Sequence, residues 1–180
     1  MSSSELVVLS GPPGAGKSTV AELLVTEFEP SALVTGDTFF AFVRRGHIDP
    51  WLPEADAQNE TITRSAAAAA GRLARGGYTV VYDGVVGPGF IDGFARWAGL
   101  AAVHYAVLLP SEACCVERVR RRVGHGFTDP SATRHLWREF AQAEVDPRHV
   151  LQVGDSDDPE RTARAIRDGV VTGMLVRGSA

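Results

Sequence analysis

The chain is almost without lysine: Lys17 is the only one, and the other 17 of its 18 basic residues are arginine. Its two cysteines, Cys114 and Cys115, are adjacent, which excludes a disulfide framework and the usual spacing of metal ligands. The sequence also lacks an apolar run of the roughly 20 residues that a transmembrane helix needs, and its N-terminal residues Met1–Glu5 carry no basic side chain of the kind that opens a signal peptide. We therefore expect neither a membrane span nor a signal peptide, and a cytoplasmic location.

One domain covering residues 1–180 is expected, because the length suits a single domain and no linker-like stretch divides the sequence. The formal net charge of −4 argues against a general electrostatic grip on nucleic acid or on an anionic membrane surface. The sequence therefore predicts neither nucleic acid nor a membrane as a partner, and it favours no particular oligomeric state.

Short apolar runs alternate with helix-like segments along the chain. The apolar runs are nearly continuous, as in parallel strands covered by helices on both faces, and they are Leu6–Leu9, Ala32–Thr35, Tyr78–Tyr82, Val103–Leu109 and Val150–Val153. The segments with helical periodicity are Thr19–Glu27, Glu54–Arg75, Ser111–Val123 and Pro159–Thr172. This order of elements predicts an α/β fold with a parallel sheet.

Lys17 lies in the segment Gly-Pro-Pro-Gly-Ala-Gly-Lys-Ser-Thr, which fits the Walker A pattern G-x-x-x-x-G-K-S/T. The motif follows a strand and opens a helix, the context in which backbone N–H groups of a glycine-rich loop converge on phosphate oxygens. A compact ammonium group fits such a cradle where a planar guanidinium does not. The sequence therefore predicts a nucleoside triphosphate site, with Lys17 on the β- and γ-phosphates and the Ser18 hydroxyl on Mg²⁺. The predicted nucleotide-binding residues are Gly11, Pro12, Pro13, Gly14, Ala15, Gly16, Lys17, Ser18 and Thr19.

Carboxylates follow two of the expected strands. Asp83 ends the run Thr79–Tyr82, which is the Walker B pattern of a residue that holds Mg²⁺ directly or through water; the alternative is a turn residue in Asp83-Gly84. Asp37 follows the second strand, where strand carboxyl ends line the ligand crevice of an open α/β sheet. It can take the proton of an attacking hydroxyl or bind the acceptor, and the alternative is an N-cap for a helix that starts at Thr38.

A basic helix face occurs in the second half of the chain. Its members are Arg118, Arg121 and Arg122, spaced i, i+3 and i+4. In enzymes that place an arginine on the transferring phosphoryl group, that side chain accelerates transfer by about 10³–10⁵-fold. The pattern predicts an arginine-rich lid over about residues 118–133; the alternative is a solvated basic face paired with Glu112 and Glu117.

The stretch of about residues 38–60 combines aromatic side chains with a few polar ones, the usual lining of a small-molecule pocket. We expect the phosphoryl acceptor to bind there, and the candidate residues are Asp37, Phe40, Arg44, Trp51, Gln58 and Asn59. The alternatives are core positions for the aromatic residues and a solvated charge for Arg44. By position alone, Asp155 after the last expected strand is a candidate for the adenine side of the nucleotide site.

Three segments resemble the small P-loop kinases of the adenylate-kinase-like and gluconate/shikimate-kinase-like branch, with chloramphenicol phosphotransferase and zeta-toxin-type kinases nearby. They are the P-loop, the segment 77–84, and the segment 118–127 followed by Leu136 and Phe140. The resemblance implies a three-layer sandwich around a five-stranded parallel sheet of order 2-3-1-4-5, a lid that closes over the nucleotide, and ATP with Mg²⁺ as cofactors. By the same resemblance the catalytic residues are Lys17, Asp37, Arg118 and Arg122.

One departure from that family narrows the range of possible phosphoryl acceptors. Asp83-Gly84 is followed by Val-Val-Gly-Pro, where a nucleoside monophosphate kinase has Phe-Pro-Arg, so the arginine that would grip an acceptor phosphate is missing. The leading hypothesis is a kinase that moves the γ-phosphoryl group of Mg-ATP to a hydroxyl of a small molecule, either a metabolite or an antibiotic. The alternatives are a nucleoside or polynucleotide 5′-hydroxyl kinase and a regulatory P-loop ATPase without a diffusible acceptor.

Overall fold

The computed structural model describes residues 5–121, 129–154 and 158–178. Within these ranges the strands form one sheet in the order β2-β3-β1-β4-β5, with β6 paired to β4 outside this path. The strands are β1 (Leu6–Ser10), β2 (Ser31–Thr35), β3 (Thr79–Asp83), β4 (Ala102–Leu108), β5 (Val150–Leu151) and β6 (Val176–Gly178). Strands β1 to β5 pair in parallel, so the predicted α/β fold and the order 2-3-1-4-5 are confirmed.

The outer edge of β4 pairs with two short strands. β5 runs parallel to Val107 and Leu108, whereas β6 runs antiparallel to residues 102–104. β6 is missing from the sequence-based prediction because a strand of three largely exposed residues has no apolar run to reveal it.

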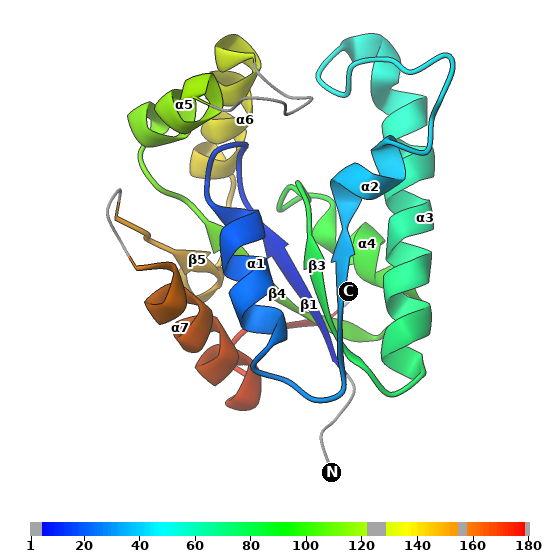
Figure 1. Ribbon diagram of the computed structural model, residues 1–180, viewed down its shortest axis with the longest axis vertical. Helices are drawn as coiled ribbons and strands as arrows, with labels where there is room; N and C mark the ends of the chain where they lie inside the picture. The colour runs from blue at the N-terminus through cyan, green and yellow to red at the C-terminus, as the bar shows by residue number, and fades with distance from the viewer. Residues whose placement is uncertain (1–4, 122–128, 155–157, 179–180) are drawn as a thin grey trace.

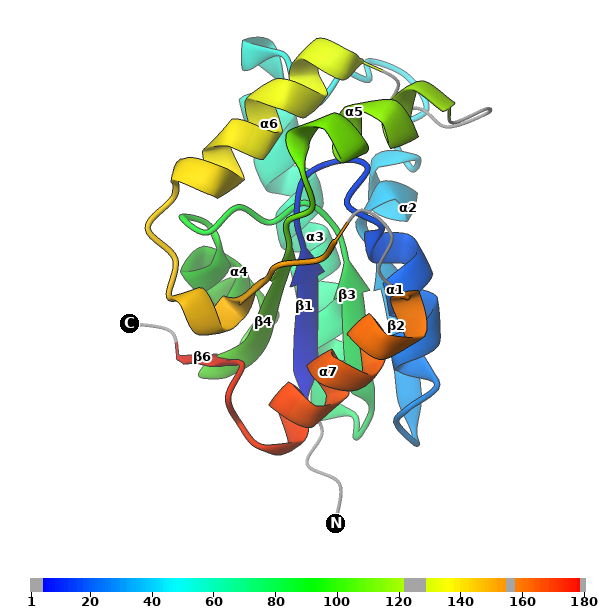
Figure 2. The same cartoon turned by 90° about the vertical axis from the view of Figure 1, so that its left-hand side faces the viewer.

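The helices form the outer layers. Figures 1 and 2 show α1 and α7 on one face of the sheet and α3 and α4 on the other, with α5 and α6 beyond the carboxyl ends of the strands. The helices are α1 (Lys17–Val25), α2 (Gly36–Phe40), α3 (Asp56–Arg75), α4 (Ile91–Ala98), α5 (Glu112–Arg121), α6 (Pro130–Gln142) and α7 (Pro159–Val171), with single 3₁₀ turns at Pro53–Ala55 and Pro147–His149. α4 is missing from the sequence-based prediction, because eight residues after a glycine-containing loop give too short a period to recognise.

Strands β1 to β4 each contribute to two apolar cores, because successive side chains point to opposite faces. Leu6 and Val8 of β1 face α3 and α4, whereas Val7 and Leu9 face α1 and α7. All four are buried. The alanine-rich face of α3 lets it approach α4 closely. At Gly71 the two helices leave no room for a side chain, since a Cβ atom there would lie 2.6 Å from the carbonyl carbon of Ala98.

Two groups of elements lie on either side of the carboxyl ends of the strands. In Figure 1, α5 and α6 lie on one side of this end, and α2, the segment after it and the start of α3 lie on the other. The loops that follow β1 and β3 emerge between them, whereas β2 runs directly into α2. None of the described helices is both long and apolar enough to cross a membrane.

Candidate active site

The P-loop joins the carboxyl end of β1 to the start of α1, as predicted. Gly14 and Gly16 adopt φ values of 83° and 94°, which side-chain-bearing residues rarely adopt. Space is equally restrictive, because a Cβ atom at Gly14 would lie 2.9 Å from the Cα atom of Cys115 and overlap that residue's carbonyl oxygen. The loop is therefore packed directly on the backbone of α5.

Lys17, the first residue of α1, extends back along the loop. Its Nζ atom donates hydrogen bonds to the carbonyl oxygens of Gly11 at 2.9 Å and Pro12 at 3.0 Å. Ser18 and Thr19 follow it in the first turn of α1 and are exposed. The ammonium group and these two hydroxyl-bearing residues thus lie at the helix N-terminus, where phosphate binding is favoured.

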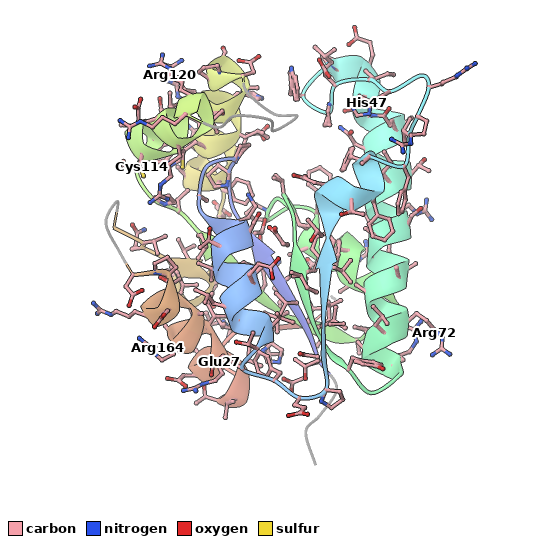
Figure 3. The ribbon with its side chains drawn as sticks, viewed as in Figure 1. Glu27, His47, Arg72, Cys114, Arg120 and Arg164 are labelled. Atoms are coloured by element: carbon pink, nitrogen blue, oxygen red, sulfur yellow. The ribbon has the colours of Figure 1, made fainter. Side chains whose placement is uncertain are left out.

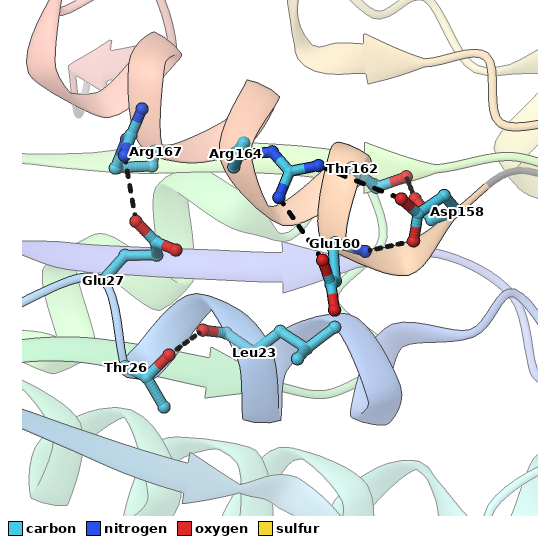
Figure 4. Close-up of polar contacts among 8 residues, drawn as sticks. All are labelled: Leu23, Thr26, Glu27, Asp158, Glu160, Thr162, Arg164 and Arg167. Carbon is cyan, nitrogen blue, oxygen red and sulfur yellow. Dashed lines mark hydrogen bonds and ion pairs between the residues drawn. The ribbon is translucent and has the colours of Figure 1, made fainter.

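A cavity of about 360 Å³ lies beside the P-loop. Its walls come from the P-loop and α1, from the end of β4, from α5, and from the β5–α7 segment; they are Gly14, Ala15, Gly16, Thr19, Val20, Leu108, Arg118, Val153, Gly154, Pro159 and Thr162. The α7 wall is fixed locally, since the Asp158 carboxylate accepts a hydrogen bond from the backbone N–H of Glu160 at 3.0 Å, and Arg167 pairs with Glu27 at the other end of α1 (Figure 4). Asp155, the predicted adenine-side residue, lies outside the described residues.

The two predicted carboxylates come together through strand pairing. Asp83 is the last residue of β3 and pairs in register with Leu9 of β1 and Thr35 of β2. Asp37 lies two residues beyond Thr35. Asp83 is 5% exposed, whereas Asp37 is open to solvent. Asp37 is not an N-cap: α2 starts at Gly36, Thr35 is its N-cap residue, and Asp37 lies in the first turn.

The oxygen ligands around this edge suit a magnesium ion. A buried carboxylate at Asp83 and a hydroxyl at Ser18, in the first turn of α1, are the hard donors that Mg²⁺ prefers. Among the described residues there is no cluster of three or more His, Cys, Asp or Glu side chains that could hold a metal alone. A magnesium ion here would therefore complete its ligand shell with nucleotide phosphates and water, as is usual for Mg²⁺ in phosphotransferases.

The described arginines of the predicted lid differ in their partners. Arg118 reaches the P-loop, where its Nη1 atom donates to the carbonyl oxygen of Gly14 at 3.3 Å. Arg121 pairs with Glu117 at 2.6 Å and is 79% exposed, as the solvated-face alternative predicts. Arg120 points away from the P-loop (Figure 3). Arg122 lies outside the described residues.

The other predicted salt bridge of that face is wrong. Glu112 does not pair with the arginines of α5; it lies 3.4 Å from Arg138 and 3.7 Å from Arg134, both on α6. α5 and α6 are thus joined by charge at the beginning of α5.

In the predicted acceptor region, two polar candidates hold the chain in place. The Gln58 amide donates to the carbonyl oxygen of Ile48 at 2.6 Å and accepts from its N–H at 2.9 Å. The Asn59 amide donates to the carbonyl oxygen of Pro50 at 2.7 Å, while its Oδ1 atom is buried without a hydrogen bond to a described group. Their first role is to shape the loop before α3; acceptor binding by them stays a prediction.

The remaining acceptor candidates are differently exposed. Phe40 and Trp51 are half-buried, and Arg44 is exposed. Next to Phe40, the rings of Phe39 and Phe42 lie 5.3 Å apart, and Phe42 is 67% exposed. An aromatic surface therefore lies a few residues beyond Asp37.

Sequence reasoning missed Tyr82, which it used only as part of a strand. The side chain is 3% exposed, and its ring packs against Phe94 of α4 with 4.7 Å between centroids. Burial, and then the charges of Asp83 and Asp37, hold the pKa of the Tyr82 hydroxyl well above its ordinary value. The hydroxyl lies beside Gly36 and Gly84, the chain neighbours of Asp37 and Asp83.

The sheet order, the P-loop and the strand-end carboxylates define a P-loop nucleotide-binding protein. Comparison with known families is more specific: the profile of a family described as an AAA domain (AAA_33) matches residues 6–145, most of the chain. The chain belongs to this family of small P-loop kinases.

Individual known proteins match the chain to different extents. A 40-residue segment is 48% identical to an adenylate kinase of Desulforamulus reducens, but it covers 22% of this chain and only 19% of that enzyme. Whole-chain likeness comes from solved structures. A tunicamycin resistance protein of Deinococcus radiodurans has a TM-score of 0.69 at 15% identity, covering 92% of this chain and 95% of that one.

Two further structures carry kinase names. A sugar kinase from Janibacter has a TM-score of 0.69 at 20% identity, with 94% of this chain and 95% of that chain covered. A gluconokinase from Sinorhizobium meliloti has a TM-score of 0.63 at 19% identity, with 96% and 94% covered. At these identities the likeness shows the shared fold and carries no substrate with it.

Proposed function

We propose that this kinase transfers the γ-phosphoryl group of ATP to a hydroxyl of a small molecule, a metabolite or an antibiotic. The observation that carries the proposal is the pairing of β2 with β3. It brings the exposed Asp37 to the carboxyl ends of the strands, where Asp83 and the P-loop also lie. A carboxylate beside the phosphate cradle can accept a proton from an attacking alcohol.

The acceptor oxygen attacks the γ-phosphorus of ATP. The bond between the γ-phosphorus and the β–γ bridging oxygen breaks, and ADP leaves. The proton of the acceptor hydroxyl passes to the Asp37 carboxylate. Bound Mg²⁺, held by Ser18 and Asp83, would supply charge neutralisation on the phosphates. Lys17 would bind the β- and γ-phosphates. Arg118, whose guanidinium donates to the Gly14 carbonyl oxygen of the P-loop, can meet the negative charge of the transferring group.

Several features support a small acceptor without a phosphate group. The missing Phe-Pro-Arg segment removes an arginine for an acceptor phosphate, and the Phe39–Phe42 pair offers an aromatic surface instead. The gluconokinase and sugar kinase of similar fold are named for polyhydroxylated substrates. The net charge of −4 disfavours long nucleic acid acceptors.

A mass-shift screen tests the proposal directly. The protein is incubated with Mg-ATP and pools of sugars, sugar acids, antibiotics, nucleosides and a 5′-hydroxyl oligonucleotide, and products are searched for one added phosphate. We expect a small molecule to be phosphorylated, and Asp37→Asn to lose most of that activity while Asp168→Asn, at an exposed carboxylate in α7, keeps it. Phosphorylation of the oligonucleotide alone would assign a polynucleotide kinase instead. ATP hydrolysis that needs no acceptor and survives Asp37→Asn would favour the regulatory ATPase.

A further inference from the structure

Tyr82 is a buried tyrosine near the carboxyl end of β3, the end of the sheet at which the candidate active site lies. It is the penultimate residue of β3, and its ring is held between the strand and α4 by Phe94. Its hydroxyl makes no hydrogen bond with another of the described residues. Tyr105, in contrast, is a buried tyrosine whose hydroxyl donates to the carbonyl oxygen of Val86 at 2.8 Å.

Two glycines create the space that the Tyr82 hydroxyl occupies. A Cβ atom at Gly36 would lie 2.7 Å from the hydroxyl oxygen, and one at Gly84 would lie 2.8 Å from it. Gly36 precedes Asp37 and Gly84 follows Asp83. The hydroxyl therefore lies between the turns that present the proposed base and the proposed metal ligand.

The phenol is a hydrogen-bond donor at this place over the whole physiological pH range. A phenol has an ordinary pKa of about 10, so it carries its proton near neutral pH and can donate it in a hydrogen bond. Among the described residues, only Asn59 Oδ1 and His104 Nδ1 are fully buried side-chain atoms without a hydrogen bond, so the Tyr82 hydroxyl oxygen keeps some contact with solvent. A ligand oxygen atom can therefore accept a hydrogen bond from it.

We propose that Tyr82 is an acceptor-binding residue, whose hydroxyl donates a hydrogen bond to an oxygen atom of the small molecule and holds the reacting hydroxyl beside Asp37. This inference rests on the proposed function, because it needs a diffusible acceptor at the strand ends. It adds a residue of β3 to the acceptor-binding candidates that the sequence places in residues 38–60.

The kinetic test compares Tyr82→Phe with Tyr78→Phe. Tyr78 lies just before β3, four residues away and 42% exposed, so its variant is a matched loss of one phenol oxygen at the opposite end of the strand. With the acceptor found in the screen, Tyr82→Phe is expected to lower kcat/KM for that acceptor about 10–100-fold. The KM for ATP should stay within about twofold, and Tyr78→Phe should change neither constant. A merely structural role of Tyr82 would change both substrates' constants together.

Fluorine NMR gives a readout that needs no turnover. The chain has only three tyrosines, so 3-fluorotyrosine labelling yields three signals that Tyr82→Phe and Tyr78→Phe assign. Mn²⁺-ATP should broaden the Tyr82 signal much more than the Tyr78 signal, since the two residues are separated by about 13 Å along the strand. Addition of the acceptor should shift the Tyr82 signal alone.

The outcomes separate this inference from the proposed function. A phosphorylated acceptor with unchanged kcat/KM in Tyr82→Phe overturns the role of Tyr82 and leaves the kinase assignment intact. A Tyr82 signal that bound Mn²⁺-ATP does not broaden also overturns it. A screen in which no small molecule is phosphorylated contradicts the proposed function, and the inference about Tyr82 with it.

Discussion

Replacing Lys17 by arginine keeps the positive charge and changes only its shape, so it tests the phosphate cradle more sharply than alanine does. In the structure one nitrogen atom lies within hydrogen-bond distance of two carbonyl oxygens, 2.9 Å from Gly11 and 3.0 Å from Pro12. A guanidinium is wider and presents its donors in a planar fork. It cannot occupy the same point without displacing the loop, whose glycines are already packed against the backbone of β4 and α5.

The expected loss follows from what the ammonium group does for the transferring group. Removal of a single preorganised donor from a developing negative charge commonly costs about 10²–10³-fold in kcat. We expect Lys17→Ala to lose at least that much, and Lys17→Arg to be impaired to a similar degree. The cost in folding should be small, about 1–2 kcal/mol, because the hydrogen bonds to Gly11 and Pro12 come from a partly buried donor that water can satisfy in their place.

The assay is ADP release with the acceptor identified by the screen, together with equilibrium binding of ATP and thermal unfolding of each variant. Arg72→Lys, at an exposed position in the last turn of α3 (Figure 3), is the control for the reverse exchange where no phosphate cradle exists, and it should be neutral. Near-normal turnover of Lys17→Arg would refute the account of why this chain keeps one lysine.

Three further outcomes are expected. Arg118→Ala should lower kcat by about 10³-fold or more if its guanidinium acts on the transferring phosphoryl group, whereas Arg121→Ala, which removes an exposed partner of another side chain, should stay within twofold in the same assay. Gly71→Ala should destabilise the fold by about 1–3 kcal/mol through overpacking against α4, while Gly93→Ala, where the nearest atoms are 3.7 Å away, should stabilise it by up to about 1 kcal/mol in chemical denaturation. Burial lowers the pKa of His149, so the unfolded chain binds more protons below its ordinary pKa of about 6.5; the free energy of unfolding should therefore fall as the pH is lowered from 7.5 to 5.5, and less steeply in His149→Asn.

Local patterns predicted the parts of the site that depend on neighbours in sequence. The P-loop needs glycines, a lysine and a hydroxyl at fixed spacing between a strand and a helix, and all of these occur within nine residues. Asp83 could be found in the sequence just as directly, because a carboxylate at the end of a strand appears as the last residue of an apolar run. The sheet order came from the resemblance to small P-loop kinases.

Long-range contacts explain what could not be predicted. Gln58 is a polar residue of the kind that lines pockets, yet its amide forms hydrogen bonds with the backbone of Ile48. This contact depends on the path of the loop between the two residues, which the sequence does not reveal. The place of the Tyr82 hydroxyl depends on Gly36 and Gly84, which become neighbours only when β2 pairs with β3. No period or motif marks a tyrosine inside a strand as part of a site.

The packing of α5 fixes Arg118 relative to the P-loop. The backbone of Cys115 lies against Gly14 so closely that a single Cβ atom would not fit between them. The start of α5 therefore cannot move away from or towards the P-loop without breaking this contact, and it belongs to the fixed nucleotide site. Arg118 follows Cys115 by one helical turn and already reaches the Gly14 carbonyl oxygen. Its position is thus set by folding, and a charge placed in advance needs little reorganisation when the phosphoryl group is transferred.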